Sequence, residues 1–160
     1  MRPWGVFTLG TALLGVAACT TPPPRAPSRE GALSTEQFRN LMQTVADGWN
    51  EGNSRKSANC FSEGAIYMEP PDAQFYEGRE SLYEFFGGKQ QPPSPGRMTW
   101  HHVLFDEAAQ VGAGEYTYQG NRRYHGIVMV RVRAGKIDRW REYQQPSTLN
   151  WTEFTGKSHF

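Results

Sequence analysis

The chain has 160 residues, of which 38% are hydrophobic and 21% are charged, and its formal net charge is +1 at pH 7. This length accommodates one domain with a single hydrophobic core. The near-neutral charge excludes the basic field typical of nucleic-acid binding, so we expect no nucleic-acid partner.

The N-terminal residues predict a targeting signal. Arg2 precedes an apolar run that is too short to span a bilayer and that ends in the tetrapeptide Val16-Ala17-Ala18-Cys19. This tetrapeptide is similar to the bacterial lipobox, which implies that residues 1–18 are removed and that Cys19 is lipidated. The alternative is an ordinary secretory signal cleaved before the cysteine. We expect a lipid-anchored protein of the bacterial cell envelope, facing the periplasm or the cell surface.

The segment after the signal is a tether. Residues 19–32 are rich in proline and polar side chains and cannot form a core. With Cys19 lipidated, Cys60 has no disulfide partner, and we expect it to be a small buried side chain.

The first predicted helix begins after Ser34. Ser34 and Gln37 have the spacing of a capping box, and Gly52 marks the end of the helix. Apolar residues then recur at the spacing of one buried helical face: Phe38, Leu41, Met42, Val45, Ala46 and Trp49.

Short elements follow in the middle of the chain. We expect helices over 54–61 and 78–86, with a strand over 65–69 that Pro70 and Pro71 terminate.

Four antiparallel strands complete the predicted domain, over 98–105, 111–118, 124–133 and 136–144. Helices followed by consecutive strands indicate an α+β fold in which helices pack on one face of a curved sheet. The tail, 146–160, retains apolar residues, so we expect it to lie over the domain.

The last two strands predict a hairpin turning at Ala134-Gly135. Pairing Arg133 with Lys136 would place Arg131 opposite Asp138. The same register would pair Met129 with Trp140, Ile127 with Glu142 and His125 with Gln144. One face would then resemble a pocket wall, although the sequence does not decide which face points inward.

Several segments together resemble the SnoaL-like branch of the nuclear transport factor 2-like superfamily, over residues 33–145. They are Trp49-Asn50-Glu51-Gly52, Phe61 to Pro70, Phe75 to Phe86 with Glu77-Gly78-Arg79, and the hairpin with Gly135-Lys136-Ile137 and Trp140-Arg141-Glu142-Tyr143. The resemblance implies a cone-shaped, cystatin-like α+β barrel with a hydrophobic pocket, commonly dimeric. It does not fix the function, because the scaffold hosts isomerases, cyclases, hydrolases and non-catalytic domains.

The resemblance makes Glu69 the first catalytic candidate, because ketosteroid isomerase-like members place a general base before a proline at this strand end. The alternative is an exposed glutamate at a turn. The oxyanion-binding tyrosine and aspartate of those enzymes correspond to Val45 and to Val128 or Ile127. SnoaL-like cyclases place an acid/base aspartate where this chain has Gln144 or Gln145. We therefore do not expect a ketosteroid-type isomerase.

His125 and Glu142 are the other catalytic candidates, because the predicted register places both on one hairpin face. A histidine oriented by a carboxylate is a competent base. The alternatives are a structural histidine and an ion pair between Glu142 and Arg141. His101 and His102 are adjacent on a strand, so at most one would enter a pocket. No close-spaced ligand motif predicts a metal, and we expect no cofactor.

The predicted substrate-binding residues either line the pocket or fill the core: Trp49, Tyr67, Trp100, Tyr116, Ile127, Met129 and Trp140. We therefore predict a membrane-anchored domain that binds a small hydrophobic molecule and transfers a proton, with Glu69 as base and His125 or Glu142 as its partner. The alternative is a non-catalytic accessory or homodimerisation module. Its interface would use Val128, Val130 and Val132 beside Arg139, Arg141 and Tyr143.

Overall fold

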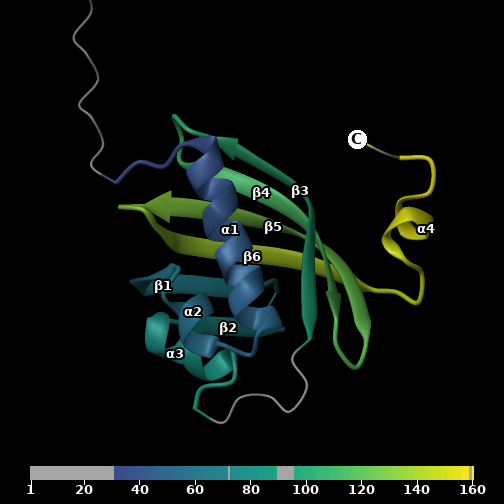
Figure 1. Ribbon diagram of the computed structural model, residues 1–160, viewed down its shortest axis with the longest axis horizontal. Helices are drawn as coiled ribbons and strands as arrows, with labels where there is room; N and C mark the ends of the chain where they lie inside the picture. Colours follow the sequence, from purple (N-terminus) through teal and green to yellow (C-terminus); the bar gives the residue numbers. More distant parts are fainter. Residues whose placement is uncertain (1–30, 72, 90–95, 159) are drawn as a thin grey trace, which may run out of the picture.

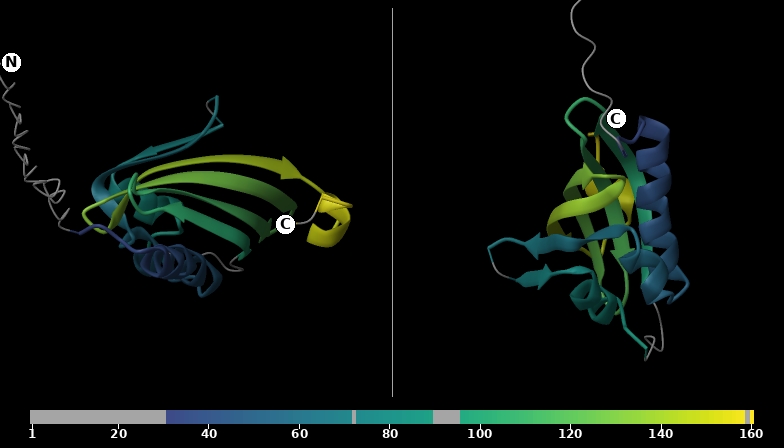
Figure 2. Two further views of the ribbon diagram at one scale, coloured as in Figure 1. Left: turned by 90° about the horizontal axis from the view of Figure 1, so that it is seen from above. Right: turned by 90° about the vertical axis from the view of Figure 1, so that its left-hand side faces the viewer.

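The computed structural model describes residues 31–71, 73–89, 96–158 and 160. They form an α+β domain in which helices α1 to α3 lie on one side of a curved six-stranded sheet (Figures 1 and 2). The expected fold class is therefore confirmed. The elements in chain order are α1 (Thr35–Asn50), α2 (Ser54–Ala58), β1 (Phe61–Glu69), β2 (Gln74–Glu77), α3 (Arg79–Phe85), β3 (Arg97–Asp106), β4 (Val111–Gln119), β5 (Arg123–Arg133), β6 (Lys136–Pro146) and α4 (Trp151–Thr155).

The predicted signal sequence and Cys19 lie outside the described residues. Within the described part of the chain, no helix has the length and apolar character needed to cross a membrane.

Helix α1 begins where its capping box predicts. The Ser34 hydroxyl accepts a hydrogen bond from the Gln37 backbone N–H, and the Gln37 side chain accepts one from the Ser34 N–H at 2.8 Å. Phe38 on the buried face stacks against Phe105 of β3 at a centroid distance of 4.2 Å. This packing holds α1 along the concave side of the sheet.

The backbone just before α1 is fixed to the turn between β3 and β4. The Leu33 N–H donates to Oε1 of Gln110 at 2.8 Å, and Nε2 of Gln110 donates back to the Leu33 carbonyl at 2.9 Å. Gln110 itself is buried. This pair of hydrogen bonds fixes the point at which the chain before α1 joins the domain.

The sheet has the order β2-β1-β6-β5-β4-β3. The last four strands, β3 to β6, are antiparallel as expected. Strand β1 pairs antiparallel with β2 and parallel with β6, a parallel pair that the sequence did not indicate. The predicted helix over 54–61 is shorter than expected, because Cys60 accepts a backbone hydrogen bond from Ile137 and the next residue begins β1. Strand β2 was not predicted, and its four residues pair with the end of β1.

The predicted hairpin register is correct only beside the turn. Arg133 pairs with Lys136, but Asp138 then forms a bulge on β6, where its carboxylate binds the side chains of Arg131 and Arg139. Beyond this bulge the register is shifted by one residue, so Val130 lies opposite Trp140 and Val128 opposite Glu142.

The one-residue shift reverses the faces of β5. Val128, Val130 and Val132 point into the core and are 0%, 1% and 4% exposed. The interface predicted from these valines is therefore wrong. Ile127 and Met129 point outward and are 42% and 37% exposed, so their predicted place beside Trp140 and Glu142 is also wrong.

A second bulge lies in β3, between Trp100 and His102. It turns both histidines to the outer face, where His101 hydrogen-bonds Thr117 at 2.7 Å and His102 contacts Glu115 at 2.8 Å. The expectation that they point to opposite faces is wrong, because a bulge interrupts the alternation of a regular strand.

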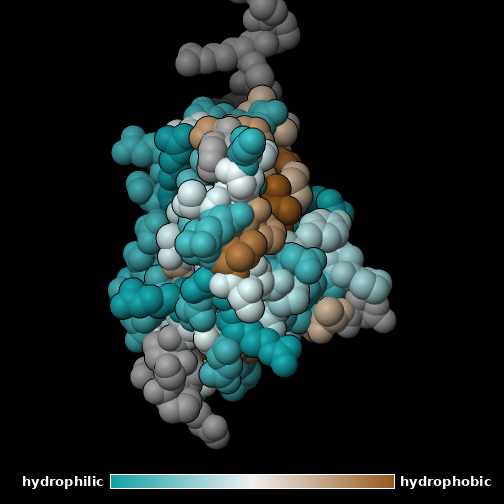
Figure 3. Space-filling view, turned by 90° about the vertical axis from the view of Figure 1, so that its right-hand side faces the viewer, coloured by the Kyte–Doolittle hydropathy of each residue, from teal (hydrophilic) through white to brown (hydrophobic). Residues whose placement is uncertain are grey.

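The C-terminal segment lies against this outer face. Trp151 of α4 stacks on His101 at a centroid distance of 4.0 Å, and Phe154 packs on His125 at 4.4 Å. The same side of the molecule carries a band of apolar side chains among hydrophilic ones (Figure 3).

Candidate functional site

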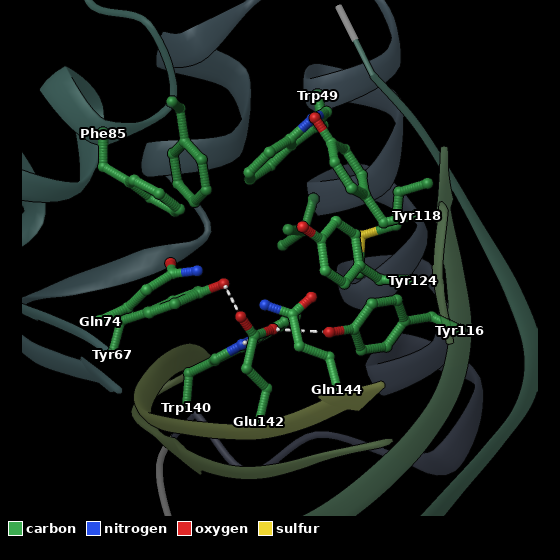
Figure 4. Close-up of a pocket in the computed structure, with 13 residues that line it drawn as sticks. Trp49, Tyr67, Gln74, Phe85, Tyr116, Tyr118, Tyr124, Trp140, Glu142 and Gln144 are labelled. Atoms are coloured by element: carbon green, nitrogen blue, oxygen red, sulfur yellow. Dashed lines mark hydrogen bonds between the residues drawn. The ribbon is translucent and has the colours of Figure 1, made fainter. Parts of the chain in front are cut away.

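A cavity of about 250 Å³ lies between the concave side of the sheet and the helices (Figure 4). Its lining comes from every strand and from the ends of α1 and α3 that face the sheet. The lining residues are Val45, Trp49, Tyr67, Gln74, Phe85, Phe86, Met98, Tyr116, Tyr118, Tyr124, Trp140, Glu142 and Gln144.

Aromatic rings in mutual contact form the walls of this cavity. Trp49 meets Phe85 and Tyr118 edge-on at centroid distances of 5.6 and 5.3 Å. On the opposite side Tyr67 stacks on Trp140 at 5.5 Å. Ring pairs at these distances hold one another in place, so the walls are preformed.

Glu142 projects into the cavity from β6 and is 4% exposed. Its Oε1 accepts a hydrogen bond from the Tyr67 hydroxyl at 2.6 Å. Its Oε2 accepts from Trp140 Nε1 at 3.1 Å and from the Tyr116 hydroxyl at 3.2 Å. The carboxylate is thus held by three neutral donors from three strands.

The position of Tyr116 depends on a glycine in the neighbouring strand. A Cβ at Gly126 would lie 2.7 Å from the Tyr116 ring, so only glycine leaves room for the ring there. This close approach brings the Tyr116 hydroxyl to Glu142.

The pKa of Glu142 is raised above its ordinary value. Burial is the largest cause, and the nearby charge of Glu69 acts in the same direction. The hydrogen bonds from Tyr67, Trp140 and Tyr116 favour the ionised form and oppose the shift. Burial and the charge of Glu142 also raise the pKa of the Tyr67 and Tyr116 hydroxyls, which therefore remain protonated donors.

No cationic side chain balances this carboxylate. The described residues that line the cavity include no lysine, arginine or histidine. None of the ion pairs in the described part of the chain includes Glu142 or Glu69. The alternative ion pair with Arg141 does not form, because adjacent strand residues point to opposite faces and Arg141 is exposed.

Glu69 lies beside the cavity and is linked to it by hydrogen bonds from two glutamine side chains. Its Oε2 accepts hydrogen bonds from Gln144 Nε2 at 2.8 Å and from Gln74 Nε2 at 3.2 Å. Both glutamines line the cavity, whereas Glu69 does not. The Gln74 Oε1 atom is buried and has no hydrogen-bond partner in the described part of the chain.

The structure brings five of the predicted site residues to the cavity: Trp49, Tyr67, Tyr116, Trp140 and Glu142. Trp100 is not among the lining residues, since its Nε1 donates to the Met42 carbonyl at 2.9 Å. Ile127 and Met129 lie on the outer face, as described above.

His125 is buried, but on the outer side of the sheet and away from Glu142. Its Nδ1 bonds Thr117 at 2.8 Å and its Nε2 bonds the Leu149 carbonyl at 3.0 Å. The predicted grouping of His125 and Glu142 on one face is therefore wrong, and the cause is again the bulge at Asp138.

Cys60 is buried, and burial raises the pKa of its thiol to about 11. This thiol is protonated at neutral pH and is a poor nucleophile. Among the described residues, no three His, Cys, Asp or Glu side chains are grouped closely enough to hold a metal ion.

Sequence reasoning missed several cavity residues, notably Gln74, Tyr118 and Tyr124. Gln74 lies on the unpredicted strand β2. Tyr118 and Tyr124 face each other across the β4–β5 hairpin, and that pairing was the available signal. Of the two glutamines at the cyclase-like position, Gln144 lines the cavity.

Many solved structures share this architecture, and the following three are among them. A protein of unknown function with a cystatin-like fold from Methylobium petroleophilum PM1 has 19% identity and a TM-score of 0.64, covering 80% of this chain and 85% of its own. A putative ketosteroid isomerase from Kribbella flavida DSM 17836 has 22% identity and a TM-score of 0.59, covering 79% and 92%. The epoxide hydrolase/cyclase-like enzyme SalBIII, from pyran ring formation in salinomycin, has 18% identity and a TM-score of 0.57, covering 69% and 92%. At these identities the likeness shows the fold alone.

No curated protein sequence matches this chain. The family model of the SnoaL-like domain matches residues 42–140, more than half of the chain. With the curved sheet, the helices on its concave side and the cavity between them, this match establishes that the chain belongs to the SnoaL-like domain family of the nuclear transport factor 2-like superfamily.

Proposed function

We propose that this chain is a lipid-anchored protein of the bacterial cell envelope whose SnoaL-like domain binds a small, largely apolar molecule. The observation that supports binding is Glu142, a buried carboxylate in a cavity with aromatic walls. The lipobox-like sequence that ends at Cys19 supports the anchoring.

The energetics favour a functional role for this cavity. An unfilled cavity forfeits packing, and a buried carboxylate without a cationic partner costs solvation free energy. Both features destabilise the fold, and a well-packed apolar core would avoid them. Local costs of this kind concentrate at functional sites.

Proton transfer is the chemistry best matched to the cavity. Glu142 lines it directly, and its raised pKa makes it a better proton acceptor than an exposed glutamate. Glu69, the base suggested by the family resemblance, contacts the cavity only through Gln144 and Gln74. We therefore assign proton transfer to Glu142 and the positioning of the two amides to Glu69.

Native mass spectrometry of the purified chain tests the binding proposal. We expect the wild type to carry a reproducible added mass. Val45→Trp should abolish it, because Val45 lines the cavity and the larger side chain fills it. Ile127→Trp on the outer face is the matched control and should keep the mass. Retention of the same mass by Val45→Trp would place the ligand elsewhere.

Membrane fractionation tests the anchoring proposal. Cys19→Ser should move the protein from the membrane to the soluble fraction of a bacterial host, since lipidation occurs on the cysteine thiol. Cys60→Ser is the matched control and should leave the protein in the membrane. Membrane retention of Cys19→Ser would refute the anchor.

A second candidate function is association through the outer face of the sheet. Several large apolar side chains there are well exposed: Leu104 (69%), Tyr143 (48%), Ile127 (42%) and Met129 (37%). An exposed apolar group of this kind is typical of an interaction surface. Sedimentation velocity should then show a concentration-dependent dimer that Met129→Lys dissociates; a monomer at all concentrations would rule it out.

A further inference from the structure

We propose that the ligand of the aromatic pocket is a small organic cation with a protonated nitrogen, whose ammonium group lies beside Glu142 and Gln74. This inference rests on the proposed small-molecule binding and specifies the class of molecule bound. It is argued from the charge, the walls, the free acceptor and the size of the cavity.

The ionised form of Glu142 places a negative charge in the cavity that no cationic side chain among the described lining residues compensates. The Glu142 carboxylate is almost fully buried, and its three hydrogen-bond donors, Tyr67, Tyr116 and Trp140, are all neutral. Neutral donors lower the cost of burying a charge but do not cancel it. A ligand cation would supply the missing countercharge.

The walls suit a cation with apolar substituents. Trp49, Tyr67, Phe85, Tyr118 and Trp140 present aromatic surface to the cavity, and the faces of such rings are electronegative. A cation enclosed by ring faces is attracted to them, most strongly where water is excluded. The same rings cover the apolar parts of the ligand.

Gln74 indicates that the cation carries an N–H group. The Oε1 atom of Gln74 is buried and has no hydrogen-bond partner among the described residues. The amide orientation is set by Glu69, because a carboxylate oxygen accepts hydrogen bonds and therefore faces Nε2. Gln74 is one of the residues that line the cavity, so a protonated amine bound beside it would give this acceptor a partner.

The size of the cavity limits the ligand. Its volume of about 250 Å³ lies below the range of roughly 300–1,000 Å³ typical of sites for drug-sized molecules. A compact amine fits this space better than a fused polycyclic molecule does.

Calorimetric titration of the full chain at pH 7.5 tests the inference with three probes of similar shape. Cyclohexylammonium carries charge and N–H groups, N,N,N-trimethylcyclohexylammonium carries charge alone, and cyclohexanol is neutral. The variants are Glu142→Gln, which removes the carboxylate charge, and Gln74→Leu, which removes the free acceptor. Glu115→Gln is the matched control, because it removes a carboxylate charge on the outer face.

We expect the wild type to bind cyclohexylammonium at least about tenfold more tightly than cyclohexanol. Glu142→Gln should abolish this preference, and Glu115→Gln should preserve it. Gln74→Leu should weaken the binding of cyclohexylammonium but leave the binding of the trimethylated cation unchanged. Thermal melts of each variant establish that it is folded.

Three results would overturn the inference. Cyclohexanol binding as tightly as the ammonium, or an unchanged preference in folded Glu142→Gln, would show a neutral ligand site and leave the proposed binding function intact. The absence of binding by all three probes at millimolar concentration would contradict both the inference and the proposed function.

Discussion

His125 and Glu142 are both buried titratable residues, but they lie on opposite faces of the same sheet and are stabilised differently. His125 is 1% exposed, and each ring nitrogen has a hydrogen-bond partner, Thr117 or the Leu149 carbonyl. Glu142 is 4% exposed and also fully hydrogen-bonded, yet its carboxylate borders an open cavity and has no cationic partner.

The difference separates a structural group from a functional one. His125 is enclosed by Trp151 and Phe154 of the C-terminal segment, so no space remains for another molecule. Glu142 has space beside it and an unbalanced charge. Burial alone therefore does not identify a functional residue. What distinguishes Glu142 from His125 is the open volume beside its side chain and the lack of a countercharge for its carboxylate.

The largest predicted effect concerns the packing of the inner face. Trp140→Ala should lower the free energy of unfolding by about 3–5 kcal/mol, because the ring is 2% exposed and packs against Phe61 and Tyr67. Tyr143→Ala on the outer face should change it by only about 0.5 kcal/mol. Urea denaturation followed by circular dichroism measures both. Equal losses would contradict the assignment of faces.

A smaller effect is expected for the structural histidine. His125→Ala should cost about 1–3 kcal/mol, since it leaves the Leu149 carbonyl without its partner and removes one of the two histidines that hydrogen-bond Thr117. Hydrogen exchange should become faster in residues 149–155, while ligand binding in the cavity stays unchanged. If a folded His125→Ala protein lost ligand binding, His125 would not be a purely structural residue, and the assignment of ligand binding to the inner face alone would be wrong.

The smallest effect has the opposite sign. Glu142→Gln should raise the stability of the unliganded protein by about 1 kcal/mol near neutral pH, because it removes a buried charge and keeps a hydrogen-bonding side chain. A thermal melt measures the change. Destabilisation of the unliganded protein would show that the carboxylate is a structural group like His125.

The pH dependence sharpens this last prediction. A carboxyl group with a raised pKa binds its proton more tightly in the folded state, so its contribution to stability falls as pH rises from about 4.3, the unfolded value, through its folded pKa. The advantage of Glu142→Gln should grow across this window and level off above it. Tyr67 and Tyr116 also face Glu142, but their raised pKa values lie above this window, so these two hydroxyls do not create the difference. An advantage that is independent of pH would contradict the raised pKa.

The helix and most strand positions could be predicted from local signals in the sequence. Ser34 and Gln37 define the start of α1, and the apolar spacing identifies its buried face. The fold class follows from the order of the elements. Strand β2 could not be predicted, because its four residues, QFYE, are too few to show the two-residue alternation of a strand.

The inward face of β5 could not be predicted, because it depends on one bulged residue. Both registers of the hairpin place apolar side chains opposite Trp140, so hydrophobic pattern does not distinguish them. Asp138 decides the register through contacts with Arg131 and Arg139, and one of these arginines was its predicted partner in the regular ladder. The sequence correctly predicted that Glu142 and Trp140 share one face, because both lie on β6. It predicted the wrong β5 residues opposite them, because the register was off by one residue.

The hydrogen bonds between Leu33 and Gln110 determine where the chain before α1 joins the domain. They fix the tether to the start of α1, whereas Val45 and Trp49, which line the cavity, lie toward its end. A helix of 16 residues is about 24 Å long, so the attachment point and these two cavity residues are separated along the length of α1. A chain anchored at Cys19 would therefore enter the domain at the end of α1 that is farther from Val45 and Trp49, and it would leave the cavity-lining end of this helix unattached.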